Sequence, residues 1–110
     1  MNTKYINEDK LLILEITEEV DHHTAEKIRR KADYEIQRYM PKKAIFDFAN
    51  VTFMDSSGIG MIIGRYKMLM MLDGTLGITN VKPSIKRIME MSGLLKIIPI
   101  YEETTSEQCL

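Results

Sequence analysis

The residues with the clearest capacity for chemistry lie at positions 55–58, where Asp-Ser-Ser-Gly follows an apolar segment and precedes a helical pattern. This order places Ser56 and Ser57 at a predicted helix start, where backbone N–H groups have no partner within the helix. The helix dipole adds partial positive charge there and favours an anion. Gly58 and Gly60 lack Cβ atoms, which allows close approach to the backbone. The segment is a candidate anion or modification site, although helix capping alone would produce the same pattern.

Three kinds of chemistry are consistent with serines at a helix start. A nucleotide-binding loop needs G-x-x-x-x-G-K-[ST] or G-x-G-x-x-G, and the sequence has only a Gly-x-Gly at Gly58 and Gly60. A serine hydrolase needs G-x-S-x-G, and Met54 stands where the first glycine belongs. In the third interpretation the serine hydroxyl is itself the substrate of another enzyme, which transfers a phosphate to it.

A second group of candidate residues is formed by Asp21, His22 and His23. Adjacent histidines at a helix start point in different directions, so they are poorly placed to hold one metal ion. A histidine here could act as a general base toward Ser56, but first-turn histidines are more often exposed or at an interface. The single Cys109 forms neither an intramolecular disulfide nor, with two histidines, a four-ligand zinc site. The sequence therefore predicts no catalytic residue, no metal and no cofactor.

The composition is that of one compact domain over residues 1–110, with 45% apolar and 28% charged residues. A net charge of −1 gives no overall attraction to nucleic acid or anionic lipid. The basic stretch at 27–31 has acidic neighbours, which is typical of a solvated helix face. Apolar runs are far shorter than the roughly 20 residues of a membrane span, and the polar start does not resemble a signal peptide. We expect a cytoplasmic protein that binds neither DNA nor a membrane.

Short apolar segments alternate with helical periodicity along the chain. Strands are predicted at residues 4–6, 11–16, 44–48, 75–81 and 97–101, the last at a sheet edge because it contains Pro99. Helices are predicted from about 21 to 39, 57 to 72 and 83 to 93. The order β-β-α-β-α-β-α-β predicts an α/β fold with a mixed, mostly parallel sheet and packed helices. The initial hairpin makes one strand antiparallel.

The two longer predicted helices differ in their apolar faces. The first begins at Asp21, a good N-cap residue, and ends before Pro41, with an apolar side formed by Ala25, Ile28, Ala32, Ile36 and Tyr39. In the second, Met61, Met68 and Leu72 lie beside the main apolar face. They either widen the buried face or form an exposed docking strip.

Residues 53–67, Phe-Met-Asp-Ser-Ser-Gly-Ile-Gly-Met-Ile-Ile-Gly-Arg-Tyr-Lys, resemble the signature of the STAS-domain anti-sigma factor antagonists. Residues 21–26 and 86–94 resemble two further blocks of the sporulation type in that family, the antagonists of anti-sigma F factors. The three motifs lie in the expected order and cover about residues 10–100, before a polar tail at 102–110. The three motifs together indicate this family far more specifically than any single motif does.

The resemblance implies a regulatory protein without enzymatic activity. Family members bind an anti-sigma factor that is also a serine kinase, with its ATP or ADP, and so release the sigma factor. The kinase phosphorylates the first serine of Asp-Ser-Ser-Gly, here Ser56, and a metal-dependent serine phosphatase removes the phosphate. By the same resemblance Asp55, Ser57 and Gly58 form the acceptor loop, and the partner-binding residues are Asp21, His22, His23, Thr24, Ile59, Gly60 and Met61.

Some positions depart from the family pattern. Glu18 stands where a glycine is expected, so the turn at 17–20 is expected to differ locally. The strand at 75–81 contains Gly77 and Asn80, and the short tail suggests a curtailed final helix. The alternatives are a STAS regulator of a general-stress sigma factor or signalling complex, and, from another class, a small nucleotide-binding or serine-based enzyme.

Overall fold

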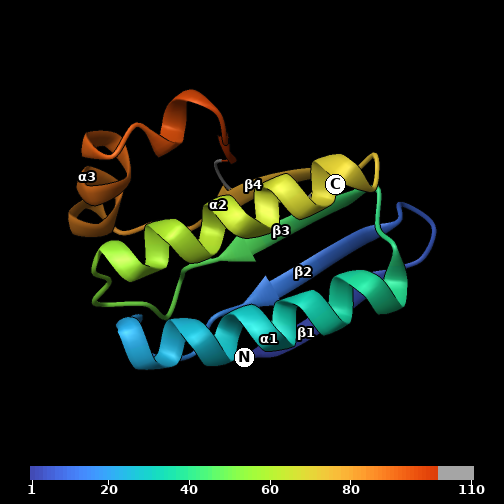
Figure 1. Ribbon diagram of the computed structural model, residues 1–110, viewed down its shortest axis with the longest axis horizontal. Coiled ribbons are helices and arrows are strands. Elements are labelled where there is room, and N and C mark those ends of the chain that lie inside the picture. Colours follow the sequence, from blue (N-terminus) through green and yellow to red (C-terminus); the bar gives the residue numbers. More distant parts are fainter. Residues whose placement is uncertain (102–110) are drawn as a thin grey trace.

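The computed structural model describes residues 1–101 as a single five-stranded sheet with helices packed on it (Figure 1). The strands lie in chain order across the sheet: β1 (Asn2–Ile6), β2 (Leu11–Glu15), β3 (Lys43–Asp47), β4 (Thr75–Thr79) and β5 (Ile100–Tyr101). β1 is antiparallel to β2, and every other neighbouring pair is parallel. The predicted mixed, mostly parallel α/β sheet with one antiparallel strand is confirmed.

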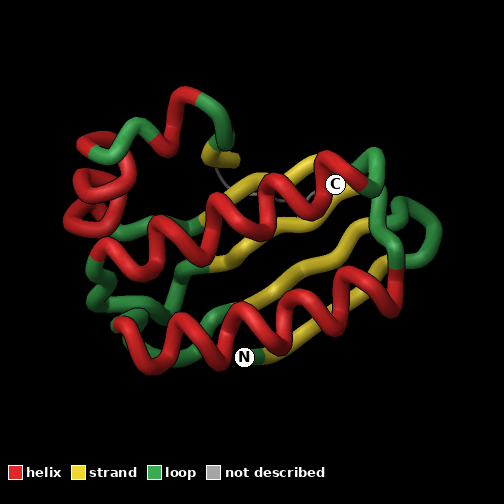
Figure 2. The backbone as a smooth tube through the Cα atoms, viewed as in Figure 1, coloured by secondary structure: helices red, strands yellow, loops and turns green. Residues whose placement is uncertain are grey.

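Two long helices lie side by side across one face of the sheet, as Figure 2 shows. They are α1 (His22–Tyr39) and α2 (Ser56–Met71), followed by α3 (Pro83–Met91) and a short 3-10 helix (Leu94–Lys96). The carboxyl ends of the parallel strands and the starts of α1 and α2 gather at the same end of the molecule (Figure 1). No helix within residues 1–101 is long and apolar enough to cross a membrane.

The core fills the space between this face of the sheet and the two helices. Alternate strand residues point into it and are almost completely buried: Leu12, Leu14, Ala44, Phe46, Leu76 and Ile78. α1 contributes the predicted buried residues Ala25, Ile28, Ala32 and Ile36, while Tyr39 is half-buried and stacks on Tyr5 of β1. Burial of each large aliphatic or aromatic side chain stabilises the fold by about 1.5–3 kcal/mol.

The buried face of α2 is wide because the helix packs on the sheet and on α1. Met61 is buried, and Met68 and Leu72 are half-buried against the core. The interpretation of these residues as a widened buried face is confirmed, and the exposed docking strip is wrong. The exposed methionines of this helix are Met70 and Met71, at its far end.

The chain departs from the predicted boundaries near the edge strand. The strand predicted at 97–101 is shorter, because a 3-10 turn precedes it and β5 pairs with β4 only through Ile100 and Tyr101. The ring of Tyr101 lies against Gly77 of β4, where a Cβ atom would come within 2.1 Å of the ring. Gly77 therefore leaves space for the Tyr101 ring. The packing of this ring compensates for the missing side chain at position 77 of the strand. Residues 102–110 are not described, so the curtailed final helix stays an expectation.

Candidate functional site

The loops that lead into α1 and α2 are joined by backbone hydrogen bonds. Val20 and Met54 form an isolated parallel bridge. The Val20 N–H donates to the carbonyl of Phe53 at 2.9 Å, and the Asp55 N–H donates to the carbonyl of Val20 at 3.0 Å. Because of this bridge, the starts of both helices are held next to one another, which the two separate sequence motifs do not by themselves require.

Asp55 caps α2 through Ser57, and Ser56 between them remains exposed to solvent. Its Oδ1 accepts a hydrogen bond from the Ser57 N–H at 2.8 Å. Ser56 is exposed, whereas Ser57 is half-buried. A Cβ atom at Gly58 would lie 2.4 Å from Met54 Sδ, so the glycine is required by close packing beneath the loop. The Ser56 hydroxyl is therefore available to a second protein, and the residues around it fix the loop.

Asp21 and Thr24 form a capping box at the start of α1. The Thr24 N–H donates to Asp21 Oδ1 at 2.9 Å, and the Asp21 N–H donates to Thr24 Oγ1 at 2.9 Å. The Thr24 hydroxyl also donates to the carbonyl of Glu19 at 2.7 Å. The hydrogen bond from the Thr24 backbone is the main cause that lowers the pKa of Asp21. These two residues shape the helix start, and His22 and His23 are exposed on it.

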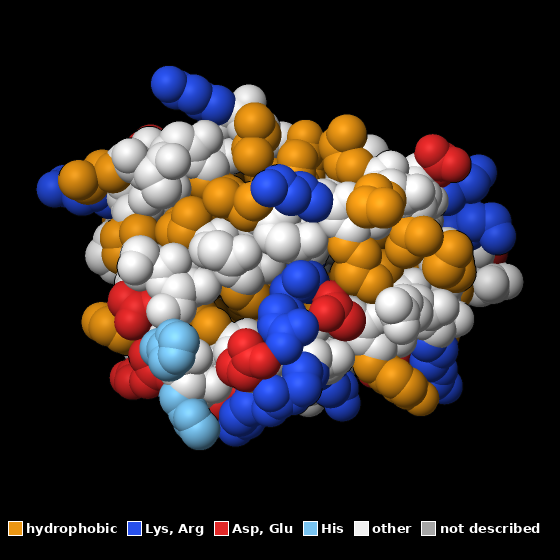
Figure 3. Space-filling view, viewed as in Figure 1, with side chains coloured by type: hydrophobic (Ala, Val, Ile, Leu, Met, Phe, Trp, Pro, Cys, Tyr) orange, Lys and Arg blue, Asp and Glu red, His pale blue; other side chains and the backbone are white. Residues whose placement is uncertain are grey.

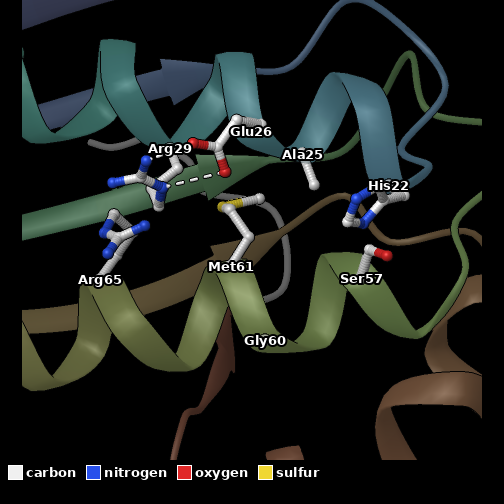
Figure 4. Close-up of a pocket in the computed structure, with 8 residues that line it drawn as sticks. All are labelled: His22, Ala25, Glu26, Arg29, Ser57, Gly60, Met61 and Arg65. Atoms are coloured by element: carbon white, nitrogen blue, oxygen red, sulfur yellow. Dashed lines mark hydrogen bonds and ion pairs between the residues drawn. The ribbon is translucent and has the colours of Figure 1, made fainter.

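A cavity of about 240 Å³ separates the first turns of α1 from those of α2 (Figure 4). At one end His22 from α1 and Ser57 from α2 point toward each other. At the other end the guanidinium groups of Arg29 and Arg65 face one another, with the Met61 side chain between the two ends. Ser57, but not the exposed Ser56, therefore lines this cavity.

The charged end of the cavity is held by an ion-pair network between the helices. Arg65 Nε lies 2.7 Å from Asp33 Oδ1, and Arg29 Nη1 lies 3.5 Å from Asp33 Oδ2. Arg29 also pairs with Glu26 on the same helix. Burial is the main cause that lowers the pKa of Arg65, whose residue surface is only 9% exposed. Two cations and two carboxylates thus meet where the helices pack together.

Sequence reasoning missed this network. It placed the basic stretch at 27–31, which contains Arg29, and its acidic neighbours on a solvated helix face, and treated Arg65 only as part of a motif. The available signal was the i, i+4 spacing of Arg29 and Asp33 next to the buried side of α1. Nothing in the linear sequence shows that Arg65 of α2 lies opposite, because that depends on how the helices pack.

The predicted partner-binding residues divide into an exposed set and a buried set. His22, His23 and Gly60 are exposed, and Asp21 and Thr24 are half-buried. Ile59 and Met61 are 7% and 5% exposed and pack in the core, so a contact between them and a partner stays a prediction. Phe53, which is 49% exposed and next to the acceptor loop, was not predicted. A large exposed aromatic ring beside the loop is better placed for contact than either buried residue.

The surface around the helix starts carries both signs of charge. Figure 3 shows the histidines at one end of α1, beside intermixed basic and acidic side chains. Within residues 1–101, no group of three His, Cys, Asp or Glu residues is arranged to hold a metal ion. Cys109 lies outside the described residues.

Comparison with known proteins identifies the family. Residues 2–106 match the STAS domain. The chain belongs to the STAS domain family. It is 41% identical over 92 residues to an anti-sigma F factor antagonist of Paenibacillus polymyxa, covering 84% of this chain and 79% of that protein. It is 31% identical over 85 residues to an anti-sigma-B factor antagonist of Listeria monocytogenes, covering 74% and 71%.

The fold matches SpoIIAA, an anti-sigma factor antagonist solved in two states. The unphosphorylated form gives a TM-score of 0.80 at 27% identity, with 94% of this chain and 87% of that chain covered. The phosphorylated form from Bacillus gives 0.71 at 27% identity, with 94% and 90% covered. The chain is thus an anti-sigma factor antagonist of the STAS fold.

Proposed function

We propose that this chain binds an anti-sigma factor that is a serine kinase, releases a sporulation sigma factor from it, and is switched off by phosphorylation of Ser56. The observation that carries the proposal is the exposed Ser56 at the start of α2, in a loop shaped by Asp55, Ser57 and Gly58. The 41% identity to an anti-sigma F factor antagonist and the existence of SpoIIAA in a phosphorylated form support it. The chain acts as one domain in the cytoplasm.

The proposed docking surface joins the starts of both helices. It contains the exposed His22 and His23 of α1 and the exposed Ser56 and Gly60 of α2, with Phe53 at its edge. The bridge between the two loops keeps this surface continuous. Asp21 and Thr24 support it by capping α1, and Ile59 and Met61 support it from below.

Phosphorylation changes docking more than it changes the fold. A phosphate on Ser56 adds about −1.5 to −2 charges at pH 7. The start of α2 tolerates this charge because its free N–H groups and dipole attract anions, although the neighbouring Asp55 opposes it. At the surface the phosphate must lose its hydration when a partner docks. If the binding free energy becomes less favourable by about 3 kcal/mol, the affinity for the partner falls more than a hundredfold. The metal-dependent phosphatase restores binding.

The direct test is to incubate the protein with its cognate anti-sigma kinase and ATP, then to locate the phosphate by peptide mass analysis. We expect one phosphate on Ser56. The Ser56→Ala variant should receive none, and the matched Ser57→Ala variant should still be phosphorylated on Ser56. Phosphate on Ser57 of the wild type, or no phosphate with a kinase of proven activity, contradicts the proposal.

An antagonist of a general-stress anti-sigma factor is the second candidate, since the Listeria protein that is 31% identical is an anti-sigma-B factor antagonist. The two candidates predict binding to different kinases. The 41% identity to the anti-sigma F factor antagonist favours the sporulation type. A pull-down with each purified kinase distinguishes them, because only the cognate kinase should bind and release its sigma factor.

A further inference from the structure

Phe53 is a large apolar side chain that the fold leaves at the surface close to Ser56. Its residue surface is 49% exposed, and it precedes Ser56 by three positions. The other large apolar side chains of the same loop, Phe48, Val51 and Met54, are at most 2% exposed. The loop therefore buries its apolar side chains in the core and leaves this ring outside it.

The backbone at Phe53 is fixed, and it directs the ring outward. The Val20 N–H donates to the Phe53 carbonyl at 2.9 Å, and the next residue, Met54, forms the parallel bridge with Val20. Successive side chains of an extended segment point to opposite sides, so the burial of Met54 directs Phe53 away from the core. A side chain on a backbone that is already ordered loses less conformational freedom when a partner binds.

A single exposed apolar residue is common on soluble proteins and by itself indicates no site. Within residues 1–101, the other large exposed apolar side chains are Tyr34, Met40, Met70, Met71, Met91 and Ile97. None of them belongs to the loops before α1 and α2 or to the first turns of these helices. Among this set, only Phe53 lies on the proposed docking surface.

The loops that lead into α1 and α2 are acidic. The loop before α1 contains Glu18, Glu19 and Asp21, the loop before α2 contains Asp55, and neither contains a Lys or an Arg. Asp21 and Asp55 cap the helices, and Glu18 pairs with Lys27. Glu19 is exposed and forms no ion pair among the described residues.

The position of Glu19 extends this negative charge around the ring. Glu19 directly precedes Val20, whose N–H donates to the Phe53 carbonyl. A partner that covers Phe53 therefore meets an apolar ring next to acidic loops. Complementary charge on the partner would be positive around the place that receives the ring.

We propose that Phe53 anchors the docked partner: its ring enters an apolar pocket of the anti-sigma kinase, and basic side chains at the rim of that pocket face the acidic loops. Aromatic rings that fill desolvated pockets supply much of the binding energy of protein interfaces. The kinase as partner rests on the proposed function. Phe53 is a positioning residue, which holds Ser56 at the kinase without taking part in phosphate transfer.

The first test compares the phosphorylation kinetics of Phe53→Ala and wild type, with purified kinase and saturating ATP. Loss of an anchor that acts equally before and during phosphate transfer raises the KM for the protein substrate and leaves kcat unchanged. We expect a KM at least about thirtyfold higher. An unchanged KM, or a kcat that falls as much as kcat/KM does, overturns the anchor, because Phe53 would then shape the acceptor loop instead.

A second pair of variants tests the apolar pocket even if Phe53→Ala folds poorly. Phe53→Leu and Phe53→Gln have side chains of similar size, and an amide in an apolar pocket lacks hydrogen-bond partners. The KM should be at least about tenfold lower for Phe53→Leu than for Phe53→Gln. Equal KM values for the two variants overturn the pocket.

Tyr34 provides the matched control for the loss of an exposed ring. It is 63% exposed and lies about 18 Å further along α1 than His22. Tyr34→Ala should keep its KM within about twofold of the wild type, since its surroundings do not belong to the docking surface. A rise in KM as large as that of Phe53→Ala would overturn the assignment to Phe53.

The charge of Glu19 tests the basic rim of the pocket. Charges at the rim of an interface act mainly on the association rate and are screened by salt. At low salt Glu19→Gln should associate with the kinase about threefold more slowly than the wild type, and at 1 M salt at about the same rate. Glu8→Gln is the control, because Glu8 is exposed in the turn between β1 and β2 and should associate as the wild type does. Equal rates for Glu19→Gln and wild type at low salt overturn the basic rim.

The outcomes separate the anchor from the proposed function. If the kinase phosphorylates the wild type on Ser56 and Phe53→Ala has an unchanged KM, the anchor is overturned and the proposed function stands. If no anti-sigma kinase binds or phosphorylates the wild type, the proposed function is overturned, and the anchor with it.

Discussion

At the scale of single residues, Gly58 shows how closely the acceptor loop is packed. An added methyl group would lie 2.4 Å from Met54 Sδ and 3.0 Å from Val20 Cγ1, both in buried side chains. We predict that Gly58→Ala destabilises the protein by about 1–3 kcal/mol, because the core must shift to accept the methyl group. The urea midpoint of unfolding measures this loss.

Gly60 on the same helix is the matched control for that substitution. No atom lies within 4 Å of the Cβ position at Gly60. Gly60→Ala should therefore stabilise the helix by about 0.5–1 kcal/mol through reduced backbone freedom in the unfolded chain. If both alanine variants unfold at the same urea concentration, the packing explanation for Gly58 is wrong.

Asp21 makes the stability of α1 depend on pH. Its pKa is lowered from 3.8, first of all by the hydrogen bond from the Thr24 backbone. A carboxylate with a lowered folded-state pKa stabilises the fold above its unfolded-state pKa, and this contribution is lost as the pH falls through the folded-state value. We predict that Asp21→Asn, which can still cap the helix, loses less thermal stability than the wild type between about pH 5 and pH 2. Parallel melting curves for the two proteins would contradict this.

Sequence reasoning at this scale was reliable where chemistry is local. The capping role of Asp21 follows from propensities within one turn of helix. The packing that requires Gly58 does not, because it involves Val20 as well as Met54. The exposure of Phe53 and the burial of Ile59 could not be derived in this way. Both depend on how the loop before α2 lies against Val20, a residue more than thirty positions earlier.

At the scale of elements, the contact between α1 and α2 depends on Asp33. This residue pairs with the buried Arg65 of the opposite helix and with the more exposed Arg29 of its own. We predict that Asp33→Ala destabilises the protein by about 2 kcal/mol, because it leaves a buried guanidinium without its carboxylate. Arg29→Ala should cost less than about 1 kcal/mol, since exposed ion pairs contribute little.

A double variant tests the cause of this loss. In the Asp33→Ala background, Arg65→Met replaces the uncompensated cation with an apolar side chain of similar length and should recover part of the stability. Urea unfolding of the single and double variants gives the comparison. If the double variant is less stable than Asp33→Ala alone, Arg65 stabilises the fold by some route other than this ion pair.

The sequence predicted the elements better than the contacts between them. The short apolar runs of β2 and β3 and the 3.6-residue period of α1 both reflect burial, so those elements follow from the pattern. The short β5 does not, because Pro99 and the preceding 3-10 turn limit its pairing. The helix pair was the least predictable part, since its polar contacts join residues that are polar in both helical patterns.

At the scale of the whole molecule, the proposed switch and the core are spatially separate. The parallel strands end, and α1 and α2 begin, at one end of the fold (Figure 1), while the largest buried side chains lie between the sheet and the helices. A charge added at the helix starts therefore changes the surface that a partner meets without entering the core. The proposed switch requires this separation, because its phosphate is to act on binding alone.

Ser56→Asp tests this separation directly. The new carboxylate lies at the start of α2, where the dipole favours it by about 0.3–1 kcal/mol and the neighbouring Asp55 opposes it. We predict a thermal midpoint within about 4 °C of the wild type, together with kinase binding at least a hundredfold weaker. Ser84→Asp is the matched control, because Ser84 is also exposed in the first turn of a helix, α3. That variant should bind as the wild type does. A Ser56→Asp protein that unfolds, or that binds the kinase normally, would show that charge at this position does not act through docking.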